Sequence, residues 1–246
     1  METKKIHLSV VIPAYNEEKR IPKTLTEISD YLKQQSYEWE IIVVSDGSSD
    51  RTVDIARSFS NQIKNLEVIA MPERQGKGFG VRQGMLKAKG KYRIFTDADN
   101  STPIQEVEKF WPEFDNGYEV VIGSRDVEGA DVAVPQPFFR RFLGNGFNLL
   151  VQILLGLWGV WDTQCGFKGF SSKAAEEIFS ISEIKHFGFD PEILAIAKKR
   201  GYKIKEVPIR WLNDADSKVK MSHTIKMFKE VLITRRNLWL GKYDKK

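Results

Sequence analysis

Short apolar segments alternate with helix-like segments through the first half of the chain, and this alternation limits the possible folds more than any other feature. The apolar segments cover residues 8–13, 39–44, 66–70, 92–96 and 120–122. Stretches with helical periodicity, or with turn residues that can open a helix, lie between them. Strands that alternate with helices indicate βαβ units. We therefore predict an α/β fold with a Rossmann-like, mostly parallel sheet flanked by helices.

The second half of the chain is less regular. Residues 129–139 have the composition of a loop, and residues 140–157 are predicted as a helix. One stripe of that helix is polar and carries Arg141, Asn145, Asn148 and Gln152. The apolar run around it is about half a dozen residues shorter than the ~20 needed to cross a bilayer. We expect this helix to be buried in the protein or to lie in a membrane interface.

Positive charge is concentrated near the C-terminal end. The chain has a formal net charge of +5, and residues 217–246 hold nine Lys and Arg against two acids. Such a segment can contact nucleic acid or an anionic membrane, or it can simply be solvated. We predict a main domain over residues 1–211, with halves at about 1–125 and 126–211, followed by a basic helical segment over 212–246.

The cysteine count and the start of the chain bear on location. Cys165 is the single cysteine, so no internal disulfide can form, which favours a reducing compartment. The first five residues precede a strand-like segment and not the long apolar core of a signal peptide. We expect a cytoplasmic protein.

Acidic residues follow two of the predicted strands. Asp97 and Asp99 are predicted to end one strand, and Asp46 lies at the end of another. Residues two apart on a strand point the same way, so we expect both carboxylates of the Asp-Ala-Asp motif to face one site. Parallel sheets bind ligands at the carboxyl ends of their strands, and carboxylate oxygens suit Mg²⁺ or Mn²⁺. The alternative is an ordinary strand-end turn with solvated acids.

Three further sites have a structural interpretation, a functional one or both. The turn at residues 76–78 is not a Walker motif, but a glycine turn with Lys77 at a helix start can help to hold a diphosphate. Asn16 is predicted to cap the helix that follows it. Asp190, which precedes a proline, is favoured as the N-cap of a helix, and a role as general base is the alternative.

The order and spacing of these motifs resemble those of family 2 glycosyltransferases, which have the GT-A fold. The resemblance rests on SVVIPAYNEE at residues 9–18, DGSSD at 46–50, DAD at 97–99 and GSR at 123–125. Further on, DTQCGFK and FGFDPE, which start at Asp162 and Phe187, are similar to the dolichyl-phosphate glucosyltransferase branch. The resemblance implies an inverting, metal-dependent transfer of a hexose, with glucose from UDP-glucose favoured, to a polyprenyl or dolichyl phosphate.

The resemblance also implies roles for individual residues. The nucleotide-sugar donor is expected to contact Pro13, Tyr15, Glu17, Asp46, Lys77 and Asp97. The metal is expected at Asp99, with Asp97 beside it. The acceptor phosphate is expected at Arg125 and at Arg140 or Arg141, because guanidinium groups bind phosphate through charge-assisted hydrogen bonds. A phosphate acceptor is largely deprotonated near neutral pH, so it can act as the nucleophile without a general base, and Asp190 stays the alternative base.

Three other functions remain open at this point. The same chemistry could use GDP-mannose. A sugar nucleotidyltransferase would share the alternating sheet, but it normally has a glycine-rich, arginine-containing loop where this chain has PAYN at residues 13–16. A nucleic-acid-binding module is suggested by the basic tail alone, and we do not expect nucleic acid to be a partner.

The basic C-terminal segment is predicted to be an amphipathic helix. Ile225, Phe228, Leu232 and Trp239 fall on one predicted face, and lysines and arginines occupy another. We expect this helix to hold the protein peripherally on the cytoplasmic face of an anionic membrane. The alternative is that its apolar face packs on the main domain.

Overall fold

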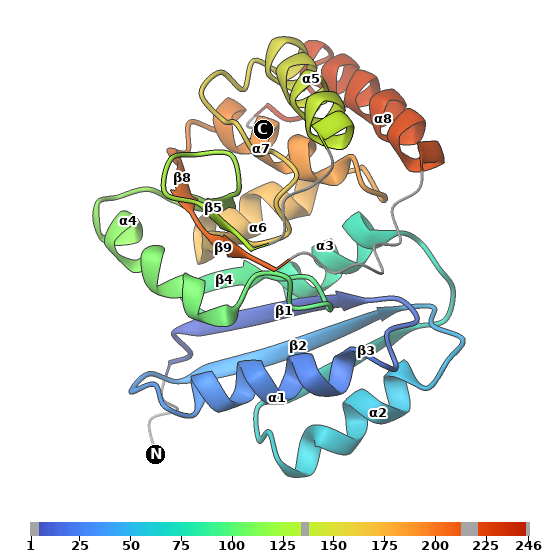
Figure 1. Ribbon diagram of the computed structural model, residues 1–246, viewed down its shortest axis with the longest axis vertical. Helices are drawn as coiled ribbons and strands as arrows, with labels where there is room; N and C mark the ends of the chain where they lie inside the picture. Colours follow the sequence, from blue (N-terminus) through green and yellow to red (C-terminus); the bar gives the residue numbers. More distant parts are fainter. Residues whose placement is uncertain (1–4, 134–137, 213–220, 245–246) are drawn as a thin grey trace.

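The computed structural model describes residues 5–133, 138–212 and 221–244, and for residues 138–145 and 221–224 it describes the backbone alone. Within this part of the chain, seven strands form one sheet in the order β3-β2-β1-β4-β7-β5-β8 (Figure 1). The strands are β1 (Leu8–Ala14), β2 (Trp39–Asp46), β3 (Leu66–Met71), β4 (Tyr92–Phe95), β5 (Val120–Ser124), β7 (Lys168–Ser171) and β8 (Ile204–Pro208). Neighbouring strands are parallel except where β7 pairs with β4 and β5. The predicted mostly parallel α/β sheet is confirmed.

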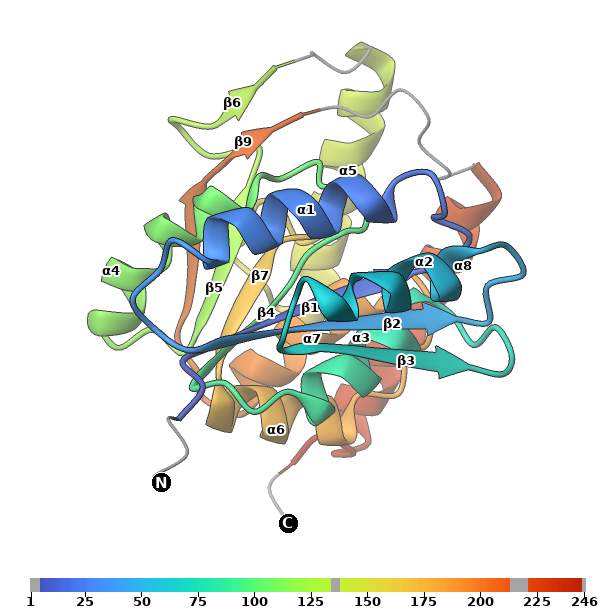
Figure 2. The ribbon, with the colours of Figure 1, turned by 90° about the horizontal axis from the view of Figure 1, so that it is seen from below.

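Helices cover both faces of the sheet (Figures 1 and 2). One face carries α1 (Ile21–Leu32) and α2 (Thr52–Ser58), and the other carries α3 (Lys77–Lys87), α6 (Ser172–Ile181) and α7 (Phe189–Lys199). Each face has its own hydrophobic core because side chains alternate along a strand. Val10 and Ile12 of β1 belong to the core beneath α1, and Val11 belongs to the opposite core.

The prediction that Asn16 caps the first helix is wrong. α1 begins at Ile21, after the N-cap residue Arg20. Asn16 has a φ of 54°, and its Oδ1 accepts a 2.8 Å hydrogen bond from the amide of Ser49. The side chain therefore joins the loops after β1 and β2, which lie together because the two strands are parallel neighbours.

The helical segment after Pro103 is divided in two. Its first part is the 3-10 helix η2 (Ile104–Lys109), and its second part is α4 (Trp111–Asp115). Pro112 lies at the junction. Proline has no N–H to donate to the preceding turn, so one continuous α-helix cannot form through this position without losing a hydrogen bond.

Two helices, α5 (Phe138–Leu155) and α8 (Met221–Trp239), contact each other and lie side by side in Figure 1. α5 confirms the helix predicted here, although it begins inside the predicted loop of residues 129–139. That loop also contains the strand β6 (Asp131–Val132), which pairs with β9 (Arg210–Trp211) outside the main sheet. Of the helices in the described ranges, none combines the length and the apolar character needed to span a bilayer.

The C-terminal helix is joined to the main core. Val231 of α8 and Tyr243 after it are buried in the core that also holds Val11. The Tyr243 hydroxyl donates a 2.7 Å hydrogen bond to Glu192 Oε1 of α7, and Asn237 Nδ2 donates to that hydroxyl at 3.0 Å. The domain boundary at residue 211 stays a prediction, but α8 packs on the same core as the sheet.

We predict that Tyr243→Phe loosens this attachment. The substitution leaves a buried Glu192 oxygen with one fewer donor, and an unsatisfied buried group costs about 1–3 kcal/mol. Urea denaturation should show the free energy of unfolding lowered by that amount. Tyr118→Phe is the control, since the Tyr118 hydroxyl makes no hydrogen bond within the described residues. Equal stability of both variants and the parent would show that the hydroxyl contributes nothing.

Candidate active site

The predicted site residues gather at one edge of the sheet, where the parallel strands end. Asp46 is the last residue of β2, and Arg125 directly follows β5. Asp97 comes two residues after β4. The strand β7 runs the other way, so its first residue, Lys168, lies at the same edge and pairs with Phe95 and Ile122. The edge therefore receives side chains from both halves of the sequence.

Asp46 holds the glycine turn in place. Its two carboxylate oxygens accept hydrogen bonds of 2.7 Å from the amides of Gln75 and Gly76, and its side chain is buried. Gly76 has a φ of 122°, and a Cβ there would lie 2.3 Å from the carbonyl oxygen of Lys185. The turn thus requires glycine, and Asp46 fixes where α3 begins. Contact between Asp46 and a nucleotide base stays a prediction.

The Asp-Ala-Asp motif forms a turn and not the end of a strand. β4 ends at Phe95, and the amide of Asn100 donates to the carbonyl of Asp97 at 3.1 Å. The expectation that strand alternation aligns the two carboxylates is therefore wrong, but the turn still brings them together. Burial and the negative charge of Asp97 raise the pKa of Asp99. Asp99 Oδ1 accepts a hydrogen bond of 2.9 Å from the amide of Ser101.

Lys77 contacts this motif from the first residue of α3. Its Nζ lies 2.5 Å from Asp97 Oδ1, and both side chains are partly exposed. Burial disfavours the ammonium group, but the charges of Asp97 and Asp190 outweigh burial and raise the pKa of Lys77. The predicted phosphate-binding lysine and the predicted donor-binding aspartate are thus in direct contact.

Asp190 lies inside the first turn of α7, whose N-cap is Gly188, so the prediction that Asp190 caps the helix is wrong. It is buried, and its Oδ1 lies 2.5 Å from Nζ of the fully buried Lys168. Burial raises the pKa of Asp190, while the positive charges of Lys168 and Lys77 act against that rise. Lys168 also donates to the carbonyl of Cys165.

Arg125 forms a two-pronged ion pair. Its Nε and Nη2 donate to Oδ2 and Oδ1 of Asp162 at 2.7 and 2.8 Å, and its backbone amide donates to the same carboxylate. Its guanidinium carbon lies 5.4 Å from the ring centre of Trp211. Burial opposes the charged forms, but the pair outweighs it, so the pKa of Arg125 is raised and that of Asp162 is lowered. The geometry gives Arg125 a structural contact in addition to its predicted acceptor role.

The other predicted donor residues lie at and after the end of β1. Pro13 is buried within the strand. The guanidinium carbon of Arg74 lies 3.9 Å from the ring centre of Tyr15. Glu17 Oε2 accepts a 3.2 Å hydrogen bond from Arg20 Nη1. The backbones of Arg140 and Arg141 belong to α5, but their side chains lie outside the described part of the chain.

Several contributors to this edge had no role predicted from the sequence. They are Arg74, Asp162, Gly166 and Lys168. A Cβ on Gly166 would lie 2.1 Å from Asp97 Oδ2, so this backbone lies directly against the carboxylate. Three of the four fall within the motif at residues 162–168, whose resemblance was the available signal. Cys165 is buried, and burial raises its pKa to about 12.

The carboxylates fit a hard divalent cation. Asp97 and Asp99 provide oxygen ligands from one turn, and burial, together with repulsion from the charge of Asp97, raises the pKa of Asp99. A cation placed between them would relieve that repulsion. Within the described residues, no group of three or more His, Cys, Asp or Glu is arranged to hold a metal. The site fits Mg²⁺ or Mn²⁺ bound by one or two carboxylates and completed by phosphate oxygens and water.

Comparisons with known proteins agree with this geometry. The family model for glycosyl transferase family 2 matches residues 9–179. A dolichyl-phosphate beta-glucosyltransferase of Trichomonas vaginalis is 36% identical, over 95% of this chain and 76% of its own. The human dolichyl-phosphate beta-glucosyltransferase is 34% identical over the same shares of the two chains.

Solved structures share the fold. Glucosyl-3-phosphoglycerate synthase from Mycobacterium tuberculosis, in complex with Mn²⁺, UDP and phosphoglyceric acid, aligns with a TM-score of 0.71 and 20% identity over 98% of this chain and 80% of its own. Mannosyl-3-phosphoglycerate synthase from Rubrobacter xylanophilus aligns with a TM-score of 0.69 and 17% identity over 96% of this chain and 76% of its own. The family model covers more than half of the chain, and the curated relatives extend the match over nearly all of it. The chain therefore belongs to glycosyltransferase family 2 and has the GT-A fold.

Proposed function

We propose that this glycosyltransferase transfers glucose from UDP-glucose to dolichyl phosphate or a related polyprenyl phosphate, with Mg²⁺ or Mn²⁺ as cofactor. The observation that carries the proposal is the cluster of Lys77, Asp97 and Asp99 at the sheet edge, which is suited to a sugar diphosphate and a cation. The curated relatives named dolichyl-phosphate beta-glucosyltransferase support the choice of glucose as the sugar and dolichyl phosphate as the acceptor. They are 34–38% identical over most of the chain.

The donor diphosphate would be bound between α3 and the Asp-Ala-Asp turn. Lys77 stands at the N-terminus of α3, where free backbone N–H groups and the helix dipole favour phosphate. Asp46 keeps that N-terminus in place through the glycine turn. Mg²⁺ or Mn²⁺ held by Asp99, with Asp97 beside it, would neutralise the charge of the departing nucleoside diphosphate.

The acceptor provides its own nucleophile. A phosphate oxygen attacks C1 of glucose, the bond from C1 to the UDP oxygen breaks, and its electron pair leaves with UDP. Attack from the face opposite to UDP inverts C1 and gives a β-linked lipid phosphate sugar. The expected ligands of the acceptor phosphate are Arg125, which directly follows β5, and Arg140 or Arg141 of α5. Asp190 is paired with Lys168, and the reaction as proposed does not need it as a base.

The proposal is tested with a panel of nucleotide sugars and a short, water-soluble polyprenyl phosphate. Product should form with UDP-glucose and depend on added Mg²⁺ or Mn²⁺. Faster transfer from GDP-mannose would show that the transferred sugar is mannose and not glucose. If UDP is released but no lipid-linked product forms with any acceptor phosphate supplied, the proposal that a polyprenyl phosphate is the acceptor is overturned.

We predict that Asp99→Asn lowers turnover about 100-fold or more, because the loss of a carboxylate ligand removes several kcal/mol of charge stabilisation. The fold should be retained, since Asp99 lies in a turn at the edge of the sheet. Asp54→Asn, at an exposed acid on α2, is the matched control and should keep full activity. Full activity of Asp99→Asn, or of the parent in excess chelator, would remove the metal from the reaction.

We predict that Arg125 and Arg141 differ when each is changed to alanine. Arg125→Ala leaves the buried Asp162 carboxylate without its partner and should lower the free energy of unfolding by about 3–5 kcal/mol. Arg141→Ala should leave stability unchanged and raise the acceptor KM at least about tenfold, with the donor KM unaltered. A stable Arg125→Ala protein that has lost only acceptor affinity would show that the pair with Asp162 is not structural.

A further inference from the structure

The outward side of α8 exposes large apolar side chains. Ile225, Phe228, Leu232 and Trp239 are exposed by 62%, 38%, 43% and 81%. They recur at helical spacing and form one stripe along the helix. A helix on the surface of a water-soluble protein normally turns such a stripe toward the core. The arrangement is reversed in α8.

The inward side of α8 is largely polar. Glu230, Thr234 and Asn237 are buried beside Val231. Glu230 Oε2 accepts a 2.8 Å hydrogen bond from the amide of Gly188, and a Cβ on Gly188 would lie 2.5 Å from Glu230 Cβ. These contacts fix the rotation of the helix. The alternative in which the apolar face of α8 packs on the main domain is therefore wrong.

The neighbouring helix extends the exposed apolar surface. Leu149 and Ile153 of α5 are exposed by 52% and 54%, and Trp158 and Trp161 after it by 61% and 57%. α5 and α8 contact each other and lie side by side (Figure 1), so these exposed side chains belong to one pair of neighbouring helices and the segment after α5. No charged residue occurs between residues 142 and 161. Tryptophan is enriched where apolar surface meets lipid headgroups.

The charges around this surface are positive. Lys226, Lys229, Arg235 and Arg236 are exposed on α8. Glu230 is the one acid in the described part of that helix, and it faces inward. An outward face that combines apolar side chains with cations complements the surface of an anionic bilayer. It does not complement itself, because a second copy would bring the same positive charges together.

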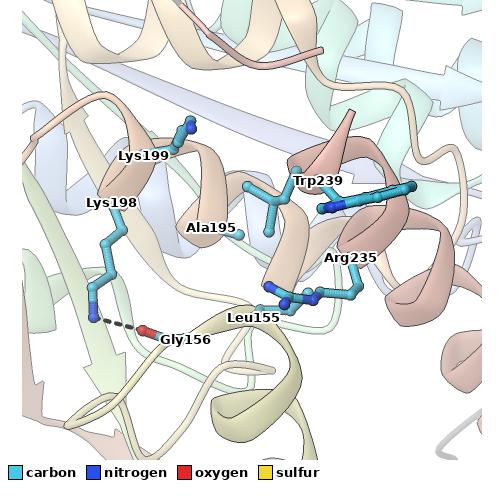
Figure 3. Close-up of a pocket in the computed structure, with 8 residues that line it drawn as sticks. Leu155, Gly156, Ala195, Lys198, Lys199, Arg235 and Trp239 are labelled. Atoms are coloured by element: carbon cyan, nitrogen blue, oxygen red, sulfur yellow. Dashed lines mark hydrogen bonds between the residues drawn. The ribbon is translucent and has the colours of Figure 1, made fainter. Parts of the chain in front are cut away.

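A hollow of about 330 Å³ opens between the C-terminal ends of α5, α7 and α8 (Figure 3). It is lined by Leu155, Gly156, Ala195, Lys198, Lys199, Arg235, Leu238 and Trp239. Lys198 Nζ donates to the carbonyl of Gly156 at 2.5 Å, and Lys199 Nζ lies 2.7 Å from Asp244 Oδ1. Two of the three cations at the hollow therefore already have partners, and its apolar floor lies next to Trp239, which is exposed by 81%.

We propose that the outer faces of α5 and α8, together with Trp158 and Trp161, form a docking surface for an anionic lipid bilayer. The apolar side chains enter the interface, and the lysines and arginines contact lipid phosphates. This inference does not depend on which sugar is transferred or on which lipid accepts it.

The docking surface is connected to the candidate active site by two contacts. Glu230 of α8 holds Gly188, which precedes Asp190 by two residues. Thr163 Oγ1 donates a 3.0 Å hydrogen bond to Asn148 Oδ1 of α5, and Thr163 follows Asp162. A bilayer on this surface would therefore lie against two helices that contact residues next to Asp162 and Asp190 of the candidate site.

Cosedimentation with vesicles tests the docking surface. Vesicles of phosphatidylcholine and phosphatidylglycerol in equal parts should bind the protein at low salt, and vesicles of phosphatidylcholine alone should bind it weakly. Lys229→Gln with Arg236→Gln should weaken binding about 30-fold, since each cation near an anionic surface contributes about 1 kcal/mol. Leu232→Asn with Trp239→Ser should weaken binding at least about tenfold through lost apolar burial.

Matched controls separate docking from nonspecific attraction and from catalysis. Arg57→Gln on α2 and Leu86→Ser on α3 remove an exposed charge and an exposed apolar side chain elsewhere, and neither should alter binding. All variants should transfer sugar to a short, water-soluble polyprenyl phosphate at the parent rate, so failure of the docking surface remains distinct from failure of the proposed function. Inorganic phosphate should not release the protein from vesicles at matched ionic strength.

Three results would overturn the proposal. One is equal recovery in the supernatant with and without anionic vesicles at low salt. Another is vesicle binding that the α8 variants leave unchanged. The third is a concentration-dependent dimer that Leu232→Asn with Trp239→Ser dissociates, in a protein that ignores vesicles, because this surface would then cover a second copy.

Discussion

The antiparallel strand β7 supports the rest of the site through the ion pair between Lys168 and Asp190. Parallel neighbours end at the catalytic edge, whereas β7 begins there, so the motif that precedes it is delivered to the same place. Lys168 is fully buried at the start of β7, and it requires an anion because an unpaired buried ammonium is very unfavourable. Asp190 meets that requirement from the first turn of α7. The pair thus joins the centre of the sheet to the helix on which α8 packs.

The same edge carries alternating charges in close contact. Lys77 interacts electrostatically with both Asp97 and Asp190, and the negative charge of Asp97 acts on Asp99. The proposed donor diphosphate and cation would add charges of both signs here, and Lys77 would then exchange part of its contact with Asp97 for phosphate oxygens. Gly166 leaves room for the Asp97 carboxylate, and a larger residue would displace it. Arg125 is a different case, because its fork is already matched by a buried carboxylate.

Much of this could be predicted from the sequence where the signal is local and repeated. The alternation of strands and helices gave the parallel sheet, and parallel strands necessarily bring Asp46 and Asp97 to one edge. The two predicted helix caps were wrong, because each depends on one residue in one turn. Asn16 instead accepts a hydrogen bond from a neighbouring loop, and Asp190 forms an ion pair with a buried lysine. The place of β7 between β4 and β5 also has no local signal. Strand order is set by packing over the whole chain, and β7 has only four residues.

α8 shows how polar contacts can fix a helix in an orientation that hydrophobicity alone would oppose. Its buried polar groups have partners: Glu230 accepts from Gly188, Thr234 Oγ1 donates to the carbonyl of Glu230, and Asn237 donates to Tyr243. Because these groups are satisfied, their burial carries little penalty, and turning the helix over would leave them without partners. The apolar stripe therefore stays outward in water, where it contributes no free energy from burial. A helix whose inner face is held this firmly while its outer face is apolar and basic is stable in two environments, and a bilayer would bury the stripe without breaking any of the inner contacts.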